Sequence, residues 1–284
     1  MTEARESDAD VRRVPSGWRP VVVFVVLAYG LGWMWWIPLA LGGETVTHGA
    51  TPTQLPGLMA PALAALLVTA FTTGRIGLVE LVHRMLRWRI GLVWWGVAVS
   101  PVLVAVVVLV AKGAATGRWP TAVDLGGVNG FPDVGGFWGL AVLVVLLVVV
   151  NGLGEETGWR GFLQLRLRTR MGFVPAVAVV TLVWAGWHLP LFWVLESFEG
   201  FGPGTLTGFL VGMFAGAVVL GWIVERTGSV LAVACWHASY NLGSATVAAR
   251  GSVAAAVTTV VMVQAAIVLG WRLWHRPDRE RGVA

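Results

Sequence analysis

The sequence predicts an all-α membrane protein, a polytopic bundle of about eight transmembrane helices, from its composition and the length of its apolar runs. Of the 284 residues, 57% are hydrophobic and only 12% are charged, and the mean hydropathy is +0.76. Soluble domains carry about a quarter charged residues, so this chain lacks the polar surface to cover a water-exposed globule. Apolar runs that face lipid remove that requirement.

Eight apolar runs are long enough to cross, or nearly cross, a hydrocarbon core of about 30 Å. They lie near 21–41, 57–73, 92–111, 137–157, 173–194, 205–224, 229–248 and 252–271. The first twenty residues (1–20) are charged and predict a short disordered cytosolic tail with no cleavable signal peptide. The polar hairpin 158–172 joins the fourth and fifth runs.

The apolar runs divide the chain into four segments. They are the tail at 1–20, the N-terminal spans at 21–136, a segment at 137–248 that holds three polar clusters, and a last span with a basic tail at 249–284. Within the second segment, residues 75–90 are too charged to span. Their apolar residues recur at helical spacing, opposite Arg84 and Arg87, which predicts an amphipathic helix on the cytosolic face of the membrane. The apolar residues are Leu78, Leu81, Val82, Met85 and Leu86.

The basic residues orient the bundle. With the N-terminus inside, seventeen of the twenty fall in cytosolic segments, and only Lys112, Arg118 and Arg250 fall outside. The seventeen are Arg5, Arg12, Arg13, Arg19, Arg75, Arg84, Arg87, Arg89, Arg160, Arg166, Arg168, Arg170, Arg226, Arg272, Arg276, Arg279 and Arg281. The positive-inside rule therefore predicts a multi-pass protein of a bacterial-type inner (plasma) membrane with both termini in the cytosol.

Charge and cysteine content narrow the function classes. The net charge of +5 and pI of about 10.6 would favour nucleic-acid binding in a soluble protein. Here the basic residues sit at span ends, so lipid and topology account for them and no nucleic-acid partner is expected. The single cysteine, Cys235, excludes an internal disulfide and is expected to be inert packing. Most of the seventeen tryptophans are expected to form an interfacial belt, including Trp94, Trp95, Trp119, Trp138, Trp271 and Trp274.

Polar clusters in the fourth, fifth and seventh runs are the main functional signal, because ionisable groups inside a membrane are costly. The first is Gly-Glu-Glu-Thr-Gly-Trp-Arg at 154–160. Arg160 follows Glu156 by one helical turn, so the two can pair. Glu155 points about 100° away around the helix and stays available for chemistry. The alternative is that both glutamates merely mark a span end.

The other two clusters supply imidazoles. His188 lies in the fifth run with Trp184 one turn before it, and Pro190 is expected to disturb the helix and free backbone carbonyls. His237 and Asn241 are four residues apart in the seventh run and share one helix face. A satisfied core histidine and interhelical packing by Ser and Asn are the alternatives.

Helix rise allows the clusters to meet. Glu156 and His188 lie sixteen residues before and after Gly172, and His237 lies nine residues past Gly228. At about 1.5 Å per residue, one plane in the cytosolic half of the bilayer can hold all three clusters, with the hairpin tip reaching into the cytosol.

These three motifs, in this order, resemble the CPBP family, which contains the type II CAAX prenyl endopeptidases and the Abi-like bacteriocin-processing and immunity proteins. The resemblance covers roughly 137–248 and implies that this segment is a catalytic domain. It matches Glu155, Glu156 and Arg160, then His188, then His237 with Asn241. The family usually has Phe where Trp184 stands, which keeps an aromatic wall but takes more volume, so the exchange bears on pocket shape and substrate choice.

The resemblance implies hydrolysis of a peptide bond of a membrane-associated, CAAX-type prenylated or other, protein or peptide. Glu155 with His188 would activate water, His237 and Asn241 would stabilise the oxyanion, and Arg160 would orient the glutamates. Members are often called metalloproteases, and Glu155, His188 and His237 could hold zinc. The absence of a His-Glu-x-x-His motif favours a mechanism without a cofactor.

Two other functions stay open on the sequence. One is an immunity or peptide-maturation protein of the same family, which does not exclude proteolysis. The other is a transporter, although transporters commonly carry paired repeats with broken helices in both halves, whereas the polar clusters here occupy only the C-terminal half.

Overall fold

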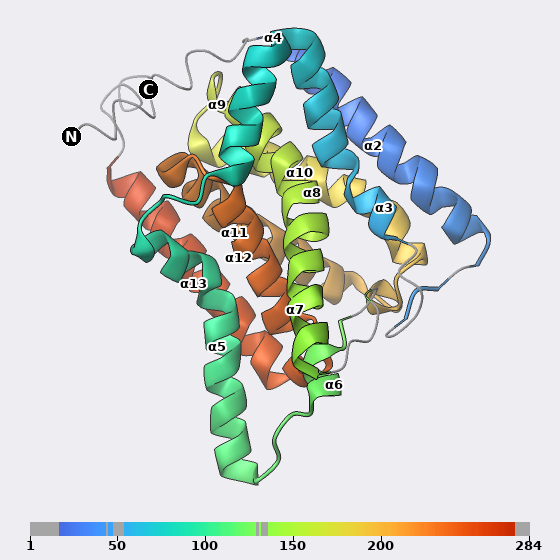
Figure 1. The fold of residues 1–284 in the computed structure, drawn as a ribbon, viewed down its shortest axis with the longest axis vertical. Helices are drawn as coiled ribbons and strands as arrows, with labels where there is room; N and C mark the ends of the chain where they lie inside the picture. Colours follow the sequence, from blue (N-terminus) through green and yellow to red (C-terminus); the bar gives the residue numbers. More distant parts are fainter. Residues whose placement is uncertain (1–16, 44, 48–53, 129–130, 132–135, 276–284) are drawn as a thin grey trace.

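A computed structural model describes residues 17–43, 45–47, 54–128, 131 and 136–275, and within these ranges the fold is helical, without β-strands (Figure 1). The elements are α2 (Trp18–Leu41), α3 (Leu55–Leu58), α4 (Ala60–Leu86), α5 (Leu92–Thr116), α6 (Ala122–Gly126), α7 (Gly136–Leu146), η1 (Leu147–Leu153), α8 (Gly154–Gly158), η2 (Trp159–Gln164), α9 (Leu165–Arg168), α10 (Phe173–Trp187), η3 (Leu189–Trp193), η4 (Glu196–Phe198), α11 (Pro203–Thr227), α12 (Val230–Ser244), η5 (Val247–Ala249) and α13 (Ser252–Trp274). Segments η1 and η2 are π-helical, and η3 to η5 are 3₁₀ turns. The predicted all-α membrane bundle is confirmed.

Seven helical runs among the described residues are long and apolar enough to cross a membrane, where the sequence predicted about eight spans. The difference is the seventh predicted span, 229–248, which forms the 15-residue helix α12. Fifteen residues rise about 22 Å, less than the hydrocarbon thickness. Helix α12 packs against α5, α11, α13 and η1 and is largely buried. The seven long apolar runs and the shorter, largely buried α12 together agree with the predicted bundle of about eight helices.

The predicted amphipathic helix continues α4 after a sharp bend at Gly74, visible in Figure 1 as the turn at the top of the bundle. Gly74 has φ 61° and ψ −151°, a conformation open to glycine but not to residues with a Cβ. Beyond the bend, Ile76, Val79 and Leu86 are exposed, whereas Arg84 is buried and pairs with Glu80. Of the predicted apolar stripe, Leu81 is buried in the core whereas Val82 and Leu86 are exposed, so the stripe does not face a single environment. Placement at the membrane interface stays a prediction.

Several described arginines of the predicted cytosolic segments gather at one end of the bundle, whereas Arg160, also predicted there, is buried in its interior. Arg168 and Arg272 both bind Glu225, from α9, α13 and α11. Arg170 lies over the ring of Trp18 at the start of α2, and Arg226 lies over Trp271. We call this region the basic end. It brings the first residues of α2 and the last turn of α13 to the same end of the bundle. Arg5, Arg12, Arg13, Arg276, Arg279 and Arg281 lie outside the described residues.

Tryptophans divide between surface and core. Trp119, Trp138 and Trp274 are exposed, as a membrane belt requires. In contrast, Trp36, Trp159 and Trp187 are fully buried, and the ring of Trp187 contacts the rings of both Trp36 and Trp159. Phe24 of α2 packs on Trp159, so this aromatic core fastens α2 to the helices that carry the polar clusters. A belt therefore does not account for these three large residues.

Candidate active site

The glutamate pair lies on α8, a short α-helical segment with π-helical turns on both sides. π-Helical turns inside helices are rare and frequent at functional sites. Glycines let neighbouring backbones approach: a Cβ on Gly158 would lie 2.7 Å from the carbonyl oxygen of Pro61 in α4, and one on Gly152 would lie 2.7 Å from that of Ala234 in α12. The segment is therefore wedged between two helices, and both glutamates are buried.

Glu156 holds a buried ion cluster. Nη1 of Arg160 donates to both of its carboxylate oxygens, at 2.9 Å and 2.8 Å, so the predicted pair forms. Nδ1 of His237 lies 2.8 Å from Oε1 of the same carboxylate. Arg160 and Glu156 are fully buried and do not line the cavity described below. Glu156 therefore holds the ring of His237 through its Nδ1 atom, although the two residues are 81 positions apart in the sequence.

Glu155 points the other way, as its position on the helix predicts, and it lines the cavity. Nε1 of Trp184 donates to its Oε2 at 2.7 Å. The guanidinium of Arg160 lies over the Trp184 ring, 4.4 Å from the centroid. The ring also lies 5.7 Å from the rings of both His188 and His237. Trp184, expected as a wall of the pocket, is thus also a hydrogen-bond donor to the glutamate, a role that phenylalanine cannot fill.

His188 caps the C-terminus of α10, where the chain leaves the α-helix and enters a 3₁₀ turn containing Pro190. The predicted helix disturbance is therefore present. Nδ1 of His188 lies 2.7 Å from the carbonyl oxygen of Trp184. A carbonyl only accepts, so Nδ1 carries the proton and the neutral ring presents Nε2 as an acceptor.

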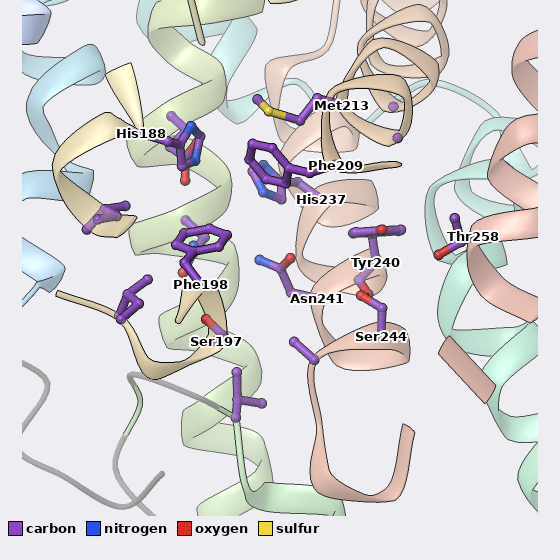
Figure 2. Close-up of a pocket in the computed structure, with 18 of the residues that line it drawn as sticks. His188, Ser197, Phe198, Phe209, Met213, His237, Tyr240, Asn241, Ser244 and Thr258 are labelled. Atoms are coloured by element: carbon purple, nitrogen blue, oxygen red, sulfur yellow. The ribbon is translucent and has the colours of Figure 1, made fainter. Parts of the chain in front are cut away.

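His237 and Asn241 project from one face of α12 into the same cavity, as their spacing predicts (Figure 2). Ser239, which faces elsewhere, accepts a hydrogen bond from the backbone N–H of Val102 at 2.9 Å. Pro101 lies inside α5 next to Val102, and the serine joins the two helices there, which is the packing role expected of polar residues in membrane helices. Cys235 is a free, partly exposed thiol outside the cavity lining.

A cavity of about 710 Å³ connects these side chains. Glu155, Trp184, His188, His237 and Asn241 line it, so three distant helical segments meet there. Aromatic and apolar residues complete much of the wall, including Phe198, Phe209, Met213, Trp236 and Tyr240 (Figure 2). From the polar groups the cavity extends toward Thr246 and Arg250, away from the basic end. The three polar clusters meet, as expected, and the cavity extends from them away from the basic end.

Sequence reasoning missed several polar residues in the lining. Asn151 lies one helical turn before Glu155, and its buried Oδ1 has no hydrogen-bond partner among the described residues. Tyr240, Ser244 and Ser197 also reach the cavity (Figure 2). Asn151 could have been found as the single polar residue in the apolar stretch 139–153, whereas Ser197 belongs to a loop whose position only the fold determines.

The zinc set considered from the sequence does not form. Within the described ranges, no three His, Cys, Asp or Glu side chains are grouped so that they could hold a metal ion. His237 and His188 direct their Nδ1 atoms at Glu156 and at a backbone carbonyl. The residues present do not fit a catalytic zinc with three protein ligands, and no step below passes through a metal.

Comparison with known proteins supports the family resemblance. Residues 137–243 match the family model of Rce1-like type II CAAX prenyl endopeptidases. The matched segment is thus similar to this endopeptidase family. A relative, CAAX prenyl protease 2 of Methanococcus maripaludis, is 24% identical over 225 residues, which cover 76% of this chain and 80% of that protein. The resemblance seen in the motifs is confirmed: the chain is a multi-pass membrane protein and an intramembrane endopeptidase, a hydrolase.

Proposed function

We propose that the endopeptidase cleaves its substrate in the 710 Å³ cavity, with Glu155 and His188 activating water and His237 and Asn241 stabilising the oxyanion. The observation that supports this most is the division of labour between adjacent glutamates. Glu156 is bound by Arg160 and His237, whereas Glu155 lines the cavity and its Oε2 accepts a hydrogen bond from Trp184.

In the first step, Glu155 takes one proton from water. Nε2 of His188 accepts a hydrogen bond from the other O–H of the same water and so orients the nucleophile. The water oxygen bonds to the carbonyl carbon of the scissile peptide, and the carbonyl π-electrons move to its oxygen. The hydrogen bond from Trp184 holds the carboxylate in position for this transfer.

The resulting oxyanion needs donors aimed at the position where its charge develops. The side-chain amide of Asn241 supplies one. His237 supplies the other from Nε2 when its ring carries both protons, and Glu156 at 2.8 Å from Nδ1 balances that charge. Collapse of the intermediate breaks the C–N bond, and Glu155 returns its proton to the departing amine.

The substrate we propose is an apolar or lipidated peptide segment of a membrane-associated protein, with a C-terminal prenyl-peptide as the first candidate. The largely apolar, aromatic wall favours a hydrophobic segment over a charged one. The match to CAAX prenyl protease 2 of Methanococcus maripaludis supports the prenyl-peptide as the first to test.

The direct test compares purified full-length protein with its Glu155→Gln variant on fluorogenic prenylated and unprenylated peptides. Loss of the general base should lower kcat by about 10²- to 10⁴-fold. Glu199→Gln is the matched control, because Glu199 is exposed and lies outside the cavity lining. Wild-type turnover in Glu155→Gln would refute the assignment.

We also propose that the protein lies in a plasma membrane with the basic end in the cytosol, on the positive-inside rule. The cavity then extends toward the non-cytosolic face. In a Cys235→Ala background, a cysteine replacing Arg250 should react with a membrane-impermeant thiol reagent added to intact cells, whereas one replacing Arg170 should not. The opposite labelling pattern would reverse the orientation.

A further inference from the structure

A second, smaller hollow lies outside the cavity, between the bent part of α4 and the helical run from η2 to α9. Its volume is about 130 Å³, and its lining includes Thr69, Thr73, Glu80, Arg84, Gly161 and Arg166. A buried water needs roughly 15 Å³ of cavity, so the hollow has room for a group with several oxygens.

Arg166 is a buried arginine in this hollow with an unused hydrogen-bond donor. Its side chain is 7% exposed, its guanidinium lies 3.4 Å over the ring of Phe162, and its Nη1 makes only a long contact, 3.5 Å, to the carbonyl of Phe162. Nε has no hydrogen-bond partner among the described residues. A buried guanidinium with an unused donor is costly unless an anion or acceptor completes it.

The charges around Arg166 favour an anion. Arg84 lies close enough to interact with it electrostatically, and Glu80 pairs with Arg84 at 2.5 Å. Two cations and one carboxylate leave the hollow with a net positive charge, although Glu80 is part of it. The described residues that line the hollow therefore carry a net positive charge, which favours an anion.

The outer surface beside the hollow favours an amphiphile. Phe71, Ile76 and Val79 are 88%, 84% and 60% exposed on the same helix, and only one residue separates Arg166 from Arg168 of the basic end. An apolar surface next to a cationic hollow at a span end is the arrangement that holds the tail and the headgroup of an anionic lipid.

We propose that this hollow binds a phosphate group, that of an anionic phospholipid headgroup, through Arg166. The test uses full-length protein in nanodiscs of phosphatidylcholine alone, or of phosphatidylcholine and phosphatidylglycerol in equal parts. Native mass spectrometry counts retained phosphatidylglycerol, and thermal unfolding reports its stabilising effect. A separate arm adds inorganic phosphate, against chloride at matched ionic strength, to protein in neutral detergent.

Arg166→Gln should weaken phosphatidylglycerol binding by about tenfold, the usual effect of losing a charge-assisted hydrogen bond. Arg89→Gln, which removes an exposed arginine of the loop after α4, should bind like wild type. Peptidase activity in phosphatidylcholine nanodiscs verifies folding. If Arg166→Gln does not fold, Arg166→Lys keeps the charge and removes the Nε donor, and it should bind more weakly than wild type.

Stabilisation by phosphatidylglycerol but not by inorganic phosphate assigns the site to the lipid, and stabilisation by both that Arg166→Gln abolishes assigns it to the phosphate group from either source. Equal phosphatidylglycerol retention by wild type and a folded Arg166 variant would overturn the proposal.

Discussion

Two glutamates in this protein each bind two cationic side chains, one in the middle of the bundle and one at the basic end. Glu156 binds Arg160 and His237 where both Glu156 and Arg160 are fully buried. Glu225 binds Arg168 and Arg272 with side chains about one fifth exposed. Both clusters tie three helical segments together, but only the first orients a side chain that lines the cavity.

The two clusters differ in whether water can solvate the cationic partners when the carboxylate is removed. Water can solvate the partners of Glu225 when an ion pair opens, so such pairs contribute little to stability. Water does not reach Arg160 in the same way, and removing its partner leaves an uncompensated buried charge. The buried cluster is therefore a rigid support for His237, and the one at the basic end is a fastening between helix ends.

The largest effect is expected from Glu156→Gln. Loss of the charge that compensates Arg160 should destabilise the protein by about 3–5 kcal/mol, and Glu155 becomes the remaining buried carboxylate near Arg160. Drawing Glu155 toward Arg160 would take it from the cavity, so turnover should also be lost. Chemical unfolding in detergent and peptide cleavage measure the two effects. Wild-type stability would show that the pair is not the support described here.

A smaller effect is expected from Trp184→Phe, which keeps an aromatic ring under Arg160 but removes the donor to Glu155. Hydrogen bonds to charged groups contribute about 1.5–3 kcal/mol, so kcat should fall by roughly tenfold or more while KM stays close to wild type. Its pH–rate profile should also shift, because the carboxylate loses a partner.

Trp138→Phe, at an exposed position, is the control for this exchange. A change confined to KM would instead assign Trp184 to substrate binding alone.

The smallest effect is expected from Glu225→Gln. The partly exposed ion pairs should contribute about 1 kcal/mol at most, and cleavage should remain at the wild-type rate because Glu225 does not contact the cavity. The same unfolding and cleavage assays apply. A loss as large as that of Glu156→Gln would remove the distinction between the two clusters.

Much of this protein was predictable from residue spacing. The Glu156–Arg160 pair, the outward turn of Glu155 and the shared face of His237 and Asn241 follow from helical geometry over four residues or fewer. The family resemblance rested on the same short motifs. The predicted orientation and the catalytic roles remain predictions.

The sequence was less informative where an apolar helix face could contact either lipid or protein. The apolar run at 229–248 suits both lipid and protein surroundings, and the structure forms it into α12, which is shorter than a full span. In the predicted apolar stripe of residues 75–90, Leu86 is exposed but Leu81 is buried in the core, and Arg84 is buried as well. In a membrane protein the apolar side does not identify the interior.

By itself, the sequence determined that the chain is a helical membrane protein with a carboxylate, two imidazoles and an amide on three of its helical segments, because hydropathy and helical period act over a few turns. Only the tertiary structure decided that His237 binds Glu156, that Trp184 binds Glu155, and that the cavity extends away from the basic end. Those contacts join residues 29 and 81 positions apart, and their partners depend on how glycines let whole helices approach.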